Sequence, residues 1–242
     1  RQPRSSHMLE QDLATLAARS LDAEALLRGA LPPASDAAFT GSLAYVDPTS
    51  TTGATANNPL AQQLQIVARM IQAGRSGALG VRRQVFFVSL GGFDTHDKQN
   101  ATHAKLMAQL SHALAWFDTS LGSMGARSQV TAFTASDFGR TFTSNGDGTD
   151  HGWGAHQFVM GGAVRGGDLY GAFPTLVAKS SGSNDFNSPD QVRNGAMLPT
   201  TSVDQLGATL GRWFGLSDGD ALKVFPNLAN FSTGARNLGF MG

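Results

Sequence analysis

Two short apolar runs, each followed by small and acidic residues, constrain the fold of this chain most. Gln84–Leu90 reads QVFFVSL, a β-branched and aromatic run of strand length, and it ends at Gly91 and Gly92. Gln129–Thr134, QVTAFT, is a second such run, and Asp137 follows it closely. In open α/β sheets, ligands bind beyond the carboxyl ends of the strands. The two runs therefore predict buried strands with a binding site at their ends.

The residues after these runs are of the kinds that bind divalent cations. Carboxylates suit hard cations such as magnesium and calcium, and neutral imidazoles add affinity for zinc and manganese. The stretch TFTSNGDGTDHGWG contains no aliphatic residue, which predicts an exposed loop where chemistry tends to lie. A single Asp or His after a strand also serves as a turn former or helix cap, and that alternative stays open for each one. The candidate ligands are Asp94, His96, Asp137, Asp150, His151 and His156.

Composition excludes several classes of function. The 18 basic and 18 acidic residues give a formal net charge of zero, so there is no basic field for nucleic acid or an anionic membrane. The absence of cysteine excludes disulfides, thiolate catalysis and cysteine-ligated metals. No apolar stretch approaches the ~20 residues of a membrane-spanning helix.

Stretches with helical periodicity lie before, between and after the strand-like runs. Apolar residues recur at helical spacing in four stretches, and Ala34–Asn57 reads as a surface linker. With Phe158–Gly162 as a third strand, this alternation predicts an α/β sandwich with a mostly parallel sheet. We expect a single α/β domain over 1–242, with a helical and linker part at 1–80 and a core at 81–242. The expected helices are Met8–Leu31, Leu60–Ala73, Ala101–Leu121 and Ser202–Phe214.

Three strands are fewer than such a sheet normally has. A typical sheet has about five or six strands. We therefore expect that an N-terminal portion is missing, and that a further N-terminal segment or a partner chain completes the sheet.

Three strings carry a family resemblance. VSLGGFDTHDKQ, LSHALAWFDTSLG and FTASDFGRTFTSNGDGTDHGWGAHQFVMGGAVRGGDLYG resemble the bacterial family catalogued as domain of unknown function 1501. The resemblance is most specific from about Gln84 to Pro174 and looser toward the C-terminus. It implies a periplasmic or extracellular location, since members often carry an export signal, although this chain shows none. It also implies that part of the expected site lies outside this chain.

That family is similar to the alkaline phosphatase and sulfatase superfamily. The similarity implies a three-layer α/β/α sandwich with a two-metal site at the strand ends. It makes Asp94, His96 and Asp137 metal ligands, and one or more of Asp150, His151 and His156 the late ligands. Superfamily members commonly have Asp-His where this chain has Asp137-Phe138. Either His151 replaces the lost imidazole, or the site is degenerate.

Two further residues are candidates for the chemistry. Ser6 is the one reasonable nucleophile, with an N-cap as its alternative role. Arg140 is placed to pair with an anionic oxygen, and its alternative role is a structural bridge to a carboxylate such as Asp147. Thr95 and Thr149 would orient ligands through their hydroxyls.

Two functions remain open at the level of sequence. The first is a metal-dependent hydrolase that acts on a small anionic ester, either a phosphate or a sulfate. The second is a non-catalytic exported binding or assembly module that keeps the fold and at most a structural ion.

Overall fold

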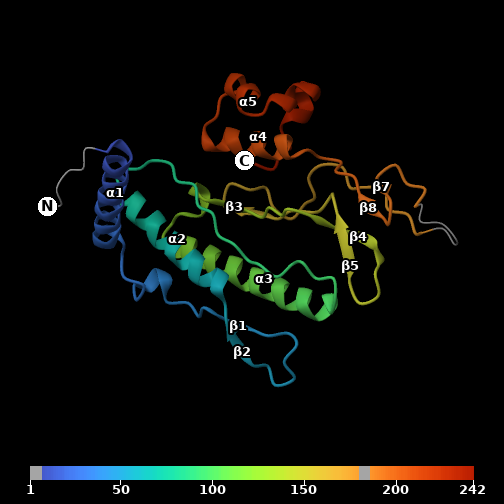
Figure 1. The fold of residues 1–242 in the computed structure, drawn as a ribbon, viewed down its shortest axis with the longest axis horizontal. Coiled ribbons are helices and arrows are strands. Elements are labelled where there is room, and N and C mark those ends of the chain that lie inside the picture. The colour runs from blue at the N-terminus through green and yellow to red at the C-terminus, as the bar shows by residue number, and fades with distance from the viewer. Residues whose placement is uncertain (1–6, 180–185) are drawn as a thin grey trace.

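The computed structural model describes residues 7–179 and 186–242, and its largest elements are helices (Figure 1). All four predicted helices are confirmed, with ends within two residues of the expected ones, and a short fifth helix follows them. Helical periodicity was a sufficient guide because each of these stretches is long and has its own cap or stop. The helices are α1 (Met8–Ala30), α2 (Pro59–Arg75), α3 (Gln99–Ser123), α4 (Val203–Phe214) and α5 (Asp218–Val224).

The strands form four separate two-stranded antiparallel sheets within the described residues. The predicted three-layer α/β/α sandwich with a mostly parallel sheet is therefore wrong. Its intended central run, Gln84–Leu90, belongs to no strand in the structure, so no parallel ladder starts from it. The pairs are β1 (Ala44–Val46) with β2 (Thr55–Asn57), β3 (Thr131–Phe133) with β6 (Val159–Gly161), β4 (Gly139–Ser144) with β5 (Thr149–Gly152), and β7 (Gln191–Val192) with β8 (Ala196–Met197).

Two of these hairpins lie in stretches that were expected to be irregular. The predicted linker Ala34–Asn57 contains β1 and β2, and the predicted exposed loop contains most of β4 and all of β5. Both stretches are polar and rich in Thr and Gly, so they lack the apolar alternation that indicates strands. Their turns bring the two halves of each hairpin together without an apolar pattern.

The main core lies between α2 and α3. Leu64, Ile71, Phe117 and Leu121 are buried there, together with Phe39 from the stretch before α2. Each buried side chain of this size contributes about 1.5–3 kcal/mol relative to an exposed one. This helix pair therefore holds the larger of the two cores in the described fold.

The start of α2 is joined to α3 by one buried amide. The Asn58 side-chain oxygen accepts hydrogen bonds from the backbone of Leu60 and Ala61, which caps the helix. Its Nδ2 donates to the Gln109 carbonyl at 2.7 Å and lies 3.1 Å from His112 Nδ1. His112 thus contacts the residue that caps α2.

Extended chain covers one side of this helix pair. Phe86, Val88 and Leu90 pack onto the core, as do residues of β3 and β6. In the view of Figure 1, α4 and α5 lie on the other side of β3 from α2 and α3. A second, smaller core joins α4 and α5 through Ala208, Ala221 and Leu228.

Of the helices in the part of the chain described, none has the length and apolar character that crossing a membrane requires.

Candidate metal centre

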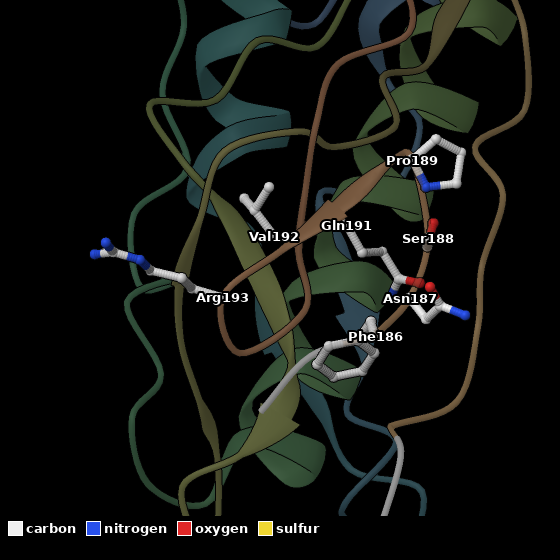
Figure 2. A pocket seen from close by; sticks show the side chains of 7 residues that line it. All are labelled: Phe186, Asn187, Ser188, Pro189, Gln191, Val192 and Arg193. Carbon is white, nitrogen blue, oxygen red and sulfur yellow. The ribbon is translucent and has the colours of Figure 1, made fainter. Parts of the chain in front are cut away.

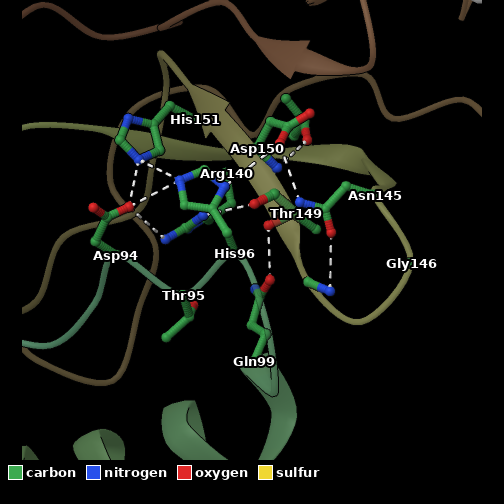
Figure 3. A network of polar contacts seen from close by, with 12 residues as sticks. Asp94, Thr95, His96, Gln99, Arg140, Asn145, Gly146, Thr149, Asp150 and His151 are labelled. Carbon is green, nitrogen blue, oxygen red and sulfur yellow. Dashed lines mark hydrogen bonds and ion pairs between the residues drawn. The ribbon is translucent and has the colours of Figure 1, made fainter.

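Two segments far apart in sequence bring one carboxylate and two imidazoles together (Figure 3). Asp94 and His96 lie in the loop before α3, and His151 lies in β5. His151 Nε2 is 2.7 Å from Asp94 Oδ1, and His96 Nε2 is 3.0 Å from the same oxygen. The two Nε2 atoms are 3.2 Å apart. These three atoms form a compact triangle, which we call the triad.

The loop before α3 is held against the β4–β5 hairpin by hydrogen bonds. The Gln99 backbone N–H donates to the Asp147 carbonyl at 3.1 Å, and the Thr149 hydroxyl donates to Gln99 Oε1 at 2.8 Å. Thr95 is buried between the two ligands of the loop, and its N–H donates to the Phe93 carbonyl. The first turn of α3 therefore fixes the position of the hairpin relative to the loop.

Gly148 permits the closest contact between these two segments. A Cβ at this position would lie 2.6 Å from the carbonyl carbon and oxygen of His96. No side chain fits there without a backbone shift, because non-bonded carbon and oxygen atoms do not approach so closely. The glycine brings the hairpin directly against a candidate ligand.

Neighbouring side chains orient both imidazoles. Asp150 Oδ1 lies 3.5 Å from His96 Nδ1 and also accepts from Asn145 Nδ2 at 3.1 Å. The Phe138 ring stacks on the His151 ring with centroids 4.0 Å apart and an interplanar angle of 2°. Metal-binding histidines commonly have a carboxylate at the nitrogen that does not face the metal. Asp150, a predicted ligand, occupies that outer position for His96.

Arg140 links the same two segments through their backbone. Its Nη1 donates to the Thr149 carbonyl at 2.7 Å, and its Nη2 donates to the Phe93 carbonyl. Nη2 also lies 3.8 Å from Asp94 Oδ1, and the guanidinium lies over the Phe138 ring. The structural role is thus present, with carbonyls as partners in place of the expected carboxylate of Asp147.

The cationic surroundings favour the ionised form of Asp94. The hydrogen bond from His151 holds the pKa of the Asp94 carboxyl below its ordinary value. Partial desolvation opposes this shift, while the charges of His151, His96 and Arg140 add to it. The carboxylate is therefore available as an anionic ligand at neutral pH.

The triad has the donors of a metal site, drawn slightly closer together than a bound ion requires. Zinc lies about 2.0–2.2 Å from its nitrogen or oxygen ligands in a tetrahedral site, so neighbouring donors are about 3.3–3.6 Å apart. The edges of 2.7–3.2 Å are shorter than this, so a bound ion would spread the three atoms by about half an ångström. Two histidines and one carboxylate are a known donor set for catalytic zinc and for non-haem iron. The three side chains are about half exposed, which leaves room for water or a ligand.

Three other predicted site residues lie elsewhere. Asp137 is exposed and lies outside the triad, just before β4. His156 is exposed, and its ring contacts Phe173 with centroids 5.3 Å apart. Ser6, the candidate nucleophile, lies outside the described residues.

Sequence reasoning missed the part that Phe138 and Gln99 play. Phe138 was noted only as the place where an imidazole is lost, yet its ring supports His151. Gln99 gave no signal, because nothing in its local pattern marks it as the partner of a hairpin fifty residues later.

A shallow hollow of the described surface lies apart from the triad (Figure 2). It has a volume of about 630 Å³, is open to solvent, and is lined by residues around β7, such as Phe186, Gln191 and Arg193. A hollow of similar size lies between α1 and Arg69. Neither contains a residue of the triad, whose side chains are about half exposed.

Comparison with protein families finds a match over most of the chain. The family described as "Protein of unknown function (DUF1501)" matches residues 6–225, which is most of the chain and includes every residue of the triad. No curated protein and no solved structure matches. The match covers both loops that build the candidate metal centre. The chain therefore belongs to the DUF1501 family.

Proposed function

We propose that this chain binds one divalent transition-metal ion through Asp94, His96 and His151, and hydrolyses a phosphate or sulfate ester there. The main observation behind this proposal is that one carboxylate and two imidazoles, from two segments distant in sequence, lie close together. The resemblance of the family to the alkaline phosphatase and sulfatase superfamily points in the same direction for the substrate.

The donor set suits a catalytic ion better than a purely structural one. Structural zinc sites are closed by four protein ligands, whereas catalytic sites have three and leave a position open. A divalent ion held here would polarise an ester oxygen and lower the pKa of a bound water.

The protein groups around the triad have separable tasks. Asp150 and Phe138 hold the two imidazoles in the orientation that points their Nε2 atoms at Asp94. Arg140 fixes the distance between the loop and the hairpin, and its positive charge lies within 3.8 Å of the triad. That charge favours an anionic substrate beside the site, as phosphate and sulfate esters are.

Metal binding is tested by titration calorimetry with zinc and manganese, and by metal analysis of the purified protein. Asp94→Ala and His151→Ala should each weaken binding by more than about 100-fold, beyond the 10–100-fold that outer partners typically contribute. Asp137→Ala and His156→Ala are matched controls, because they remove the same side-chain types outside the triad. Equal losses in the controls, or unchanged binding in both triad variants, would show that the triad is not the site.

Hydrolysis is tested separately on the metal-loaded protein. A panel of aryl phosphates, phosphodiesters and aryl sulfates is assayed with zinc, manganese, magnesium and calcium. We expect turnover that Asp94→Ala abolishes and Asp137→Ala retains. Turnover no higher than that of Asp94→Ala, in protein shown to bind metal, would refute catalysis while leaving the metal site intact.

One observation favours the second candidate function, a binding or assembly module. The triad side chains are 46–64% exposed, and no hollow described above encloses them. Catalytic sites are usually concave and exclude water. A protein that binds metal without turning over any ester would fit this alternative.

A further inference from the structure

We propose that Asn145, in the turn of the β4–β5 hairpin, is a site of spontaneous covalent modification. Its side-chain amide is attacked by the backbone nitrogen of Gly146 and is lost as ammonia. The modification itself is independent of the proposed function, whereas its effect on metal binding rests on the triad of that function.

The chain contains two Asn-Gly pairs, Asn145-Gly146 and Asn194-Gly195. Both lie in the turns of hairpins, between β4 and β5 and between β7 and β8. Reaction of an Asn side chain with the next backbone nitrogen meets the least steric resistance when that residue is Gly, which has no Cβ and the freest backbone. The two pairs have the same chemistry, so the surroundings of each decide which one reacts.

The reaction is balanced with water as its only co-reactant. The Gly146 nitrogen forms a bond to Asn145 Cγ, and the bond from Cγ to Nδ2 breaks. Ammonia leaves with the proton from the Gly146 N–H, and a cyclic imide remains. Water then opens the imide at either carbonyl, which gives aspartate or its isomer with the backbone routed through the side chain. No atom is oxidised or reduced.

The turn around Asn145 holds each reacting group on a suitable partner (Figure 3). The Gly148 N–H donates to Asn145 Oδ1 at 3.1 Å, which stabilises the negative charge that develops on this oxygen during attack. The Gly146 N–H donates to the Ser144 hydroxyl oxygen at 3.1 Å, an acceptor for the proton that the nucleophile loses. The leaving Nδ2 donates to Asp150 Oδ1 at 3.1 Å. Asn145 and Gly146 are both exposed, so water reaches them.

The second Asn-Gly pair lacks these partners and is held more rigidly. The carbonyls of Asn194 and Gly195 accept from the backbone N–H groups of Thr143 and Phe142, at 2.9 and 3.2 Å. Gly195 is buried, and a Cβ there would lie 2.6 Å from Phe142 and 2.7 Å from Phe186. Among the described residues, no hydrogen bond reaches the Asn194 side-chain amide. We therefore expect Asn194 to react more slowly than Asn145.

Both products disturb the outer partner of a triad histidine. Asp150 Oδ1 lies 3.5 Å from His96 Nδ1 and takes its other hydrogen bond from Asn145. Aspartate at position 145 cannot donate that bond, and its charge repels the carboxylate of Asp150. The isomer adds a backbone carbon to a turn in which Gly148 lies directly against His96. Modification should therefore lower the affinity of the triad for a metal ion.

Peptide mass spectrometry of the folded protein, incubated in warm neutral buffer, tests the modification. We expect conversion at Asn145 to be several-fold faster than at Asn194, and the two rates to become similar in denaturant. Ser144→Ala should slow conversion at Asn145 alone. Asn145→Gln, which would have to close a larger ring, should abolish it, whereas Asn194→Gln should leave the Asn145 rate unchanged. Equal rates at the two sites in the folded chain, or faster conversion at Asn194, would overturn the proposal.

Calorimetric titration with zinc tests the effect on the triad. Asn145→Asp, which reproduces one product, should bind zinc about tenfold more weakly than the freshly purified protein, at the lower end of the loss typical for outer partners. Asn194→Asp is the matched control and should bind as the fresh protein does. Unchanged affinity in Asn145→Asp would overturn the link to the triad. Fresh protein that binds no zinc would refute the proposed metal site instead, and the mass spectra would still decide the modification.

Discussion

At the scale of single residues, the geometry of the triad depends on a side chain that is not itself a ligand. The Phe138 ring lies flat against the His151 ring, with an interplanar angle of 2°. The stack limits rotation of the His151 ring and so keeps its Nε2 directed at Asp94. The Phe138 ring thus holds the candidate ligand His151 in place, although Phe138 has no atom that could bind a metal.

Phe138→Leu is therefore expected to weaken zinc binding while every triad residue is retained. Loss of an outer partner typically costs about 10–100-fold in metal affinity. Calorimetric titration measures the change. Phe133→Leu, a substitution of an exposed phenylalanine outside the triad, is the control and should bind as the unchanged protein does. Equal affinities in the two variants would argue against a role for the stack.

A second prediction at this scale concerns Asp47, which joins the β1–β2 hairpin to α3. Hydrogen bonds from the Thr49 hydroxyl and N–H, and then from Lys105, hold the pKa of the Asp47 carboxyl below its ordinary value. A carboxyl whose pKa is lowered by folding stabilises the fold above its unfolded pKa of about 3.9, and this stabilisation is lost as pH falls through the folded pKa.

Asp47→Asn should accordingly lower the melting temperature at pH 7, and the difference from the unchanged protein should shrink as pH falls below about 4. Thermal unfolding followed by circular dichroism over this pH range measures it. A difference that does not change with pH would indicate a packing effect instead of the charge of Asp47.

At the scale of elements, the β4–β5 hairpin positions half of the site. It carries His151, Asp150 and Arg140, and its turn reaches the loop before α3 through Gly148. Gly148→Ala is expected to push the hairpin away from His96, at a cost of about 1–3 kcal/mol in the free energy of unfolding. Metal affinity should fall with it, since the triad spans the two segments that separate.

Gly166→Ala is the matched control, because a Cβ there meets nothing within 4 Å. Denaturant unfolding measures the free energy of unfolding of both variants, and metal titration measures their metal affinity. If Gly148→Ala were as stable and bound metal as tightly as Gly166→Ala, the close contact would have no energetic importance.

The elements also show where sequence patterns are sufficient. The helices were predicted because apolar residues at 3.6-residue spacing extend over three or more turns. The hairpins in Ala34–Asn57 and around Gly148 were not, since short polar strands have no such period. Gln84–Leu90 has the composition and alternation of a strand but no partner in the described fold. Local pattern specifies an extended backbone, whereas pairing depends on what lies beside it.

At the scale of the whole molecule, stability is unevenly distributed. The α2–α3 core holds most of the buried large side chains, the α4–α5 cluster is small, and α1 buries none. Local opening requires the least free energy where few apolar contacts are broken.

Amide exchange measured by mass spectrometry should therefore be slowest in α2 and α3, intermediate in α4, and fastest among the helices in α1. A dilute sample limits protection by association. Protection of α1 equal to that of α2 would mean that a cover exists over its exposed leucines.

The candidate site was partly predictable for a related reason. Asp94, His96 and His151, which the structure brings together, were among the six candidate ligands predicted from residue type and position after apolar runs. The choice among six candidate ligands was not open to sequence, because Asp137 and His156 carry the same donors and lie just as near in the chain. In the structure, His151 is paired with Arg140 in the β4–β5 hairpin, and its ring faces Asp94 and His96 in the loop before α3. This pairing could not be predicted from the sequence.

The span of the triad has a mechanical consequence. Asp94 and His151 are separated by 57 positions, a stretch that includes all of α3 and most of the β4–β5 hairpin. The chain has no cysteine, so it has no sulfur cross-link with which to close so long a loop. An ion held by both ends would fasten them in the folded state alone, and at a hundredfold excess over its dissociation constant this linkage adds about 2.7 kcal/mol. The same three side chains would then serve as a reversible clasp, which ties the melting temperature of the protein to the supply of metal around it.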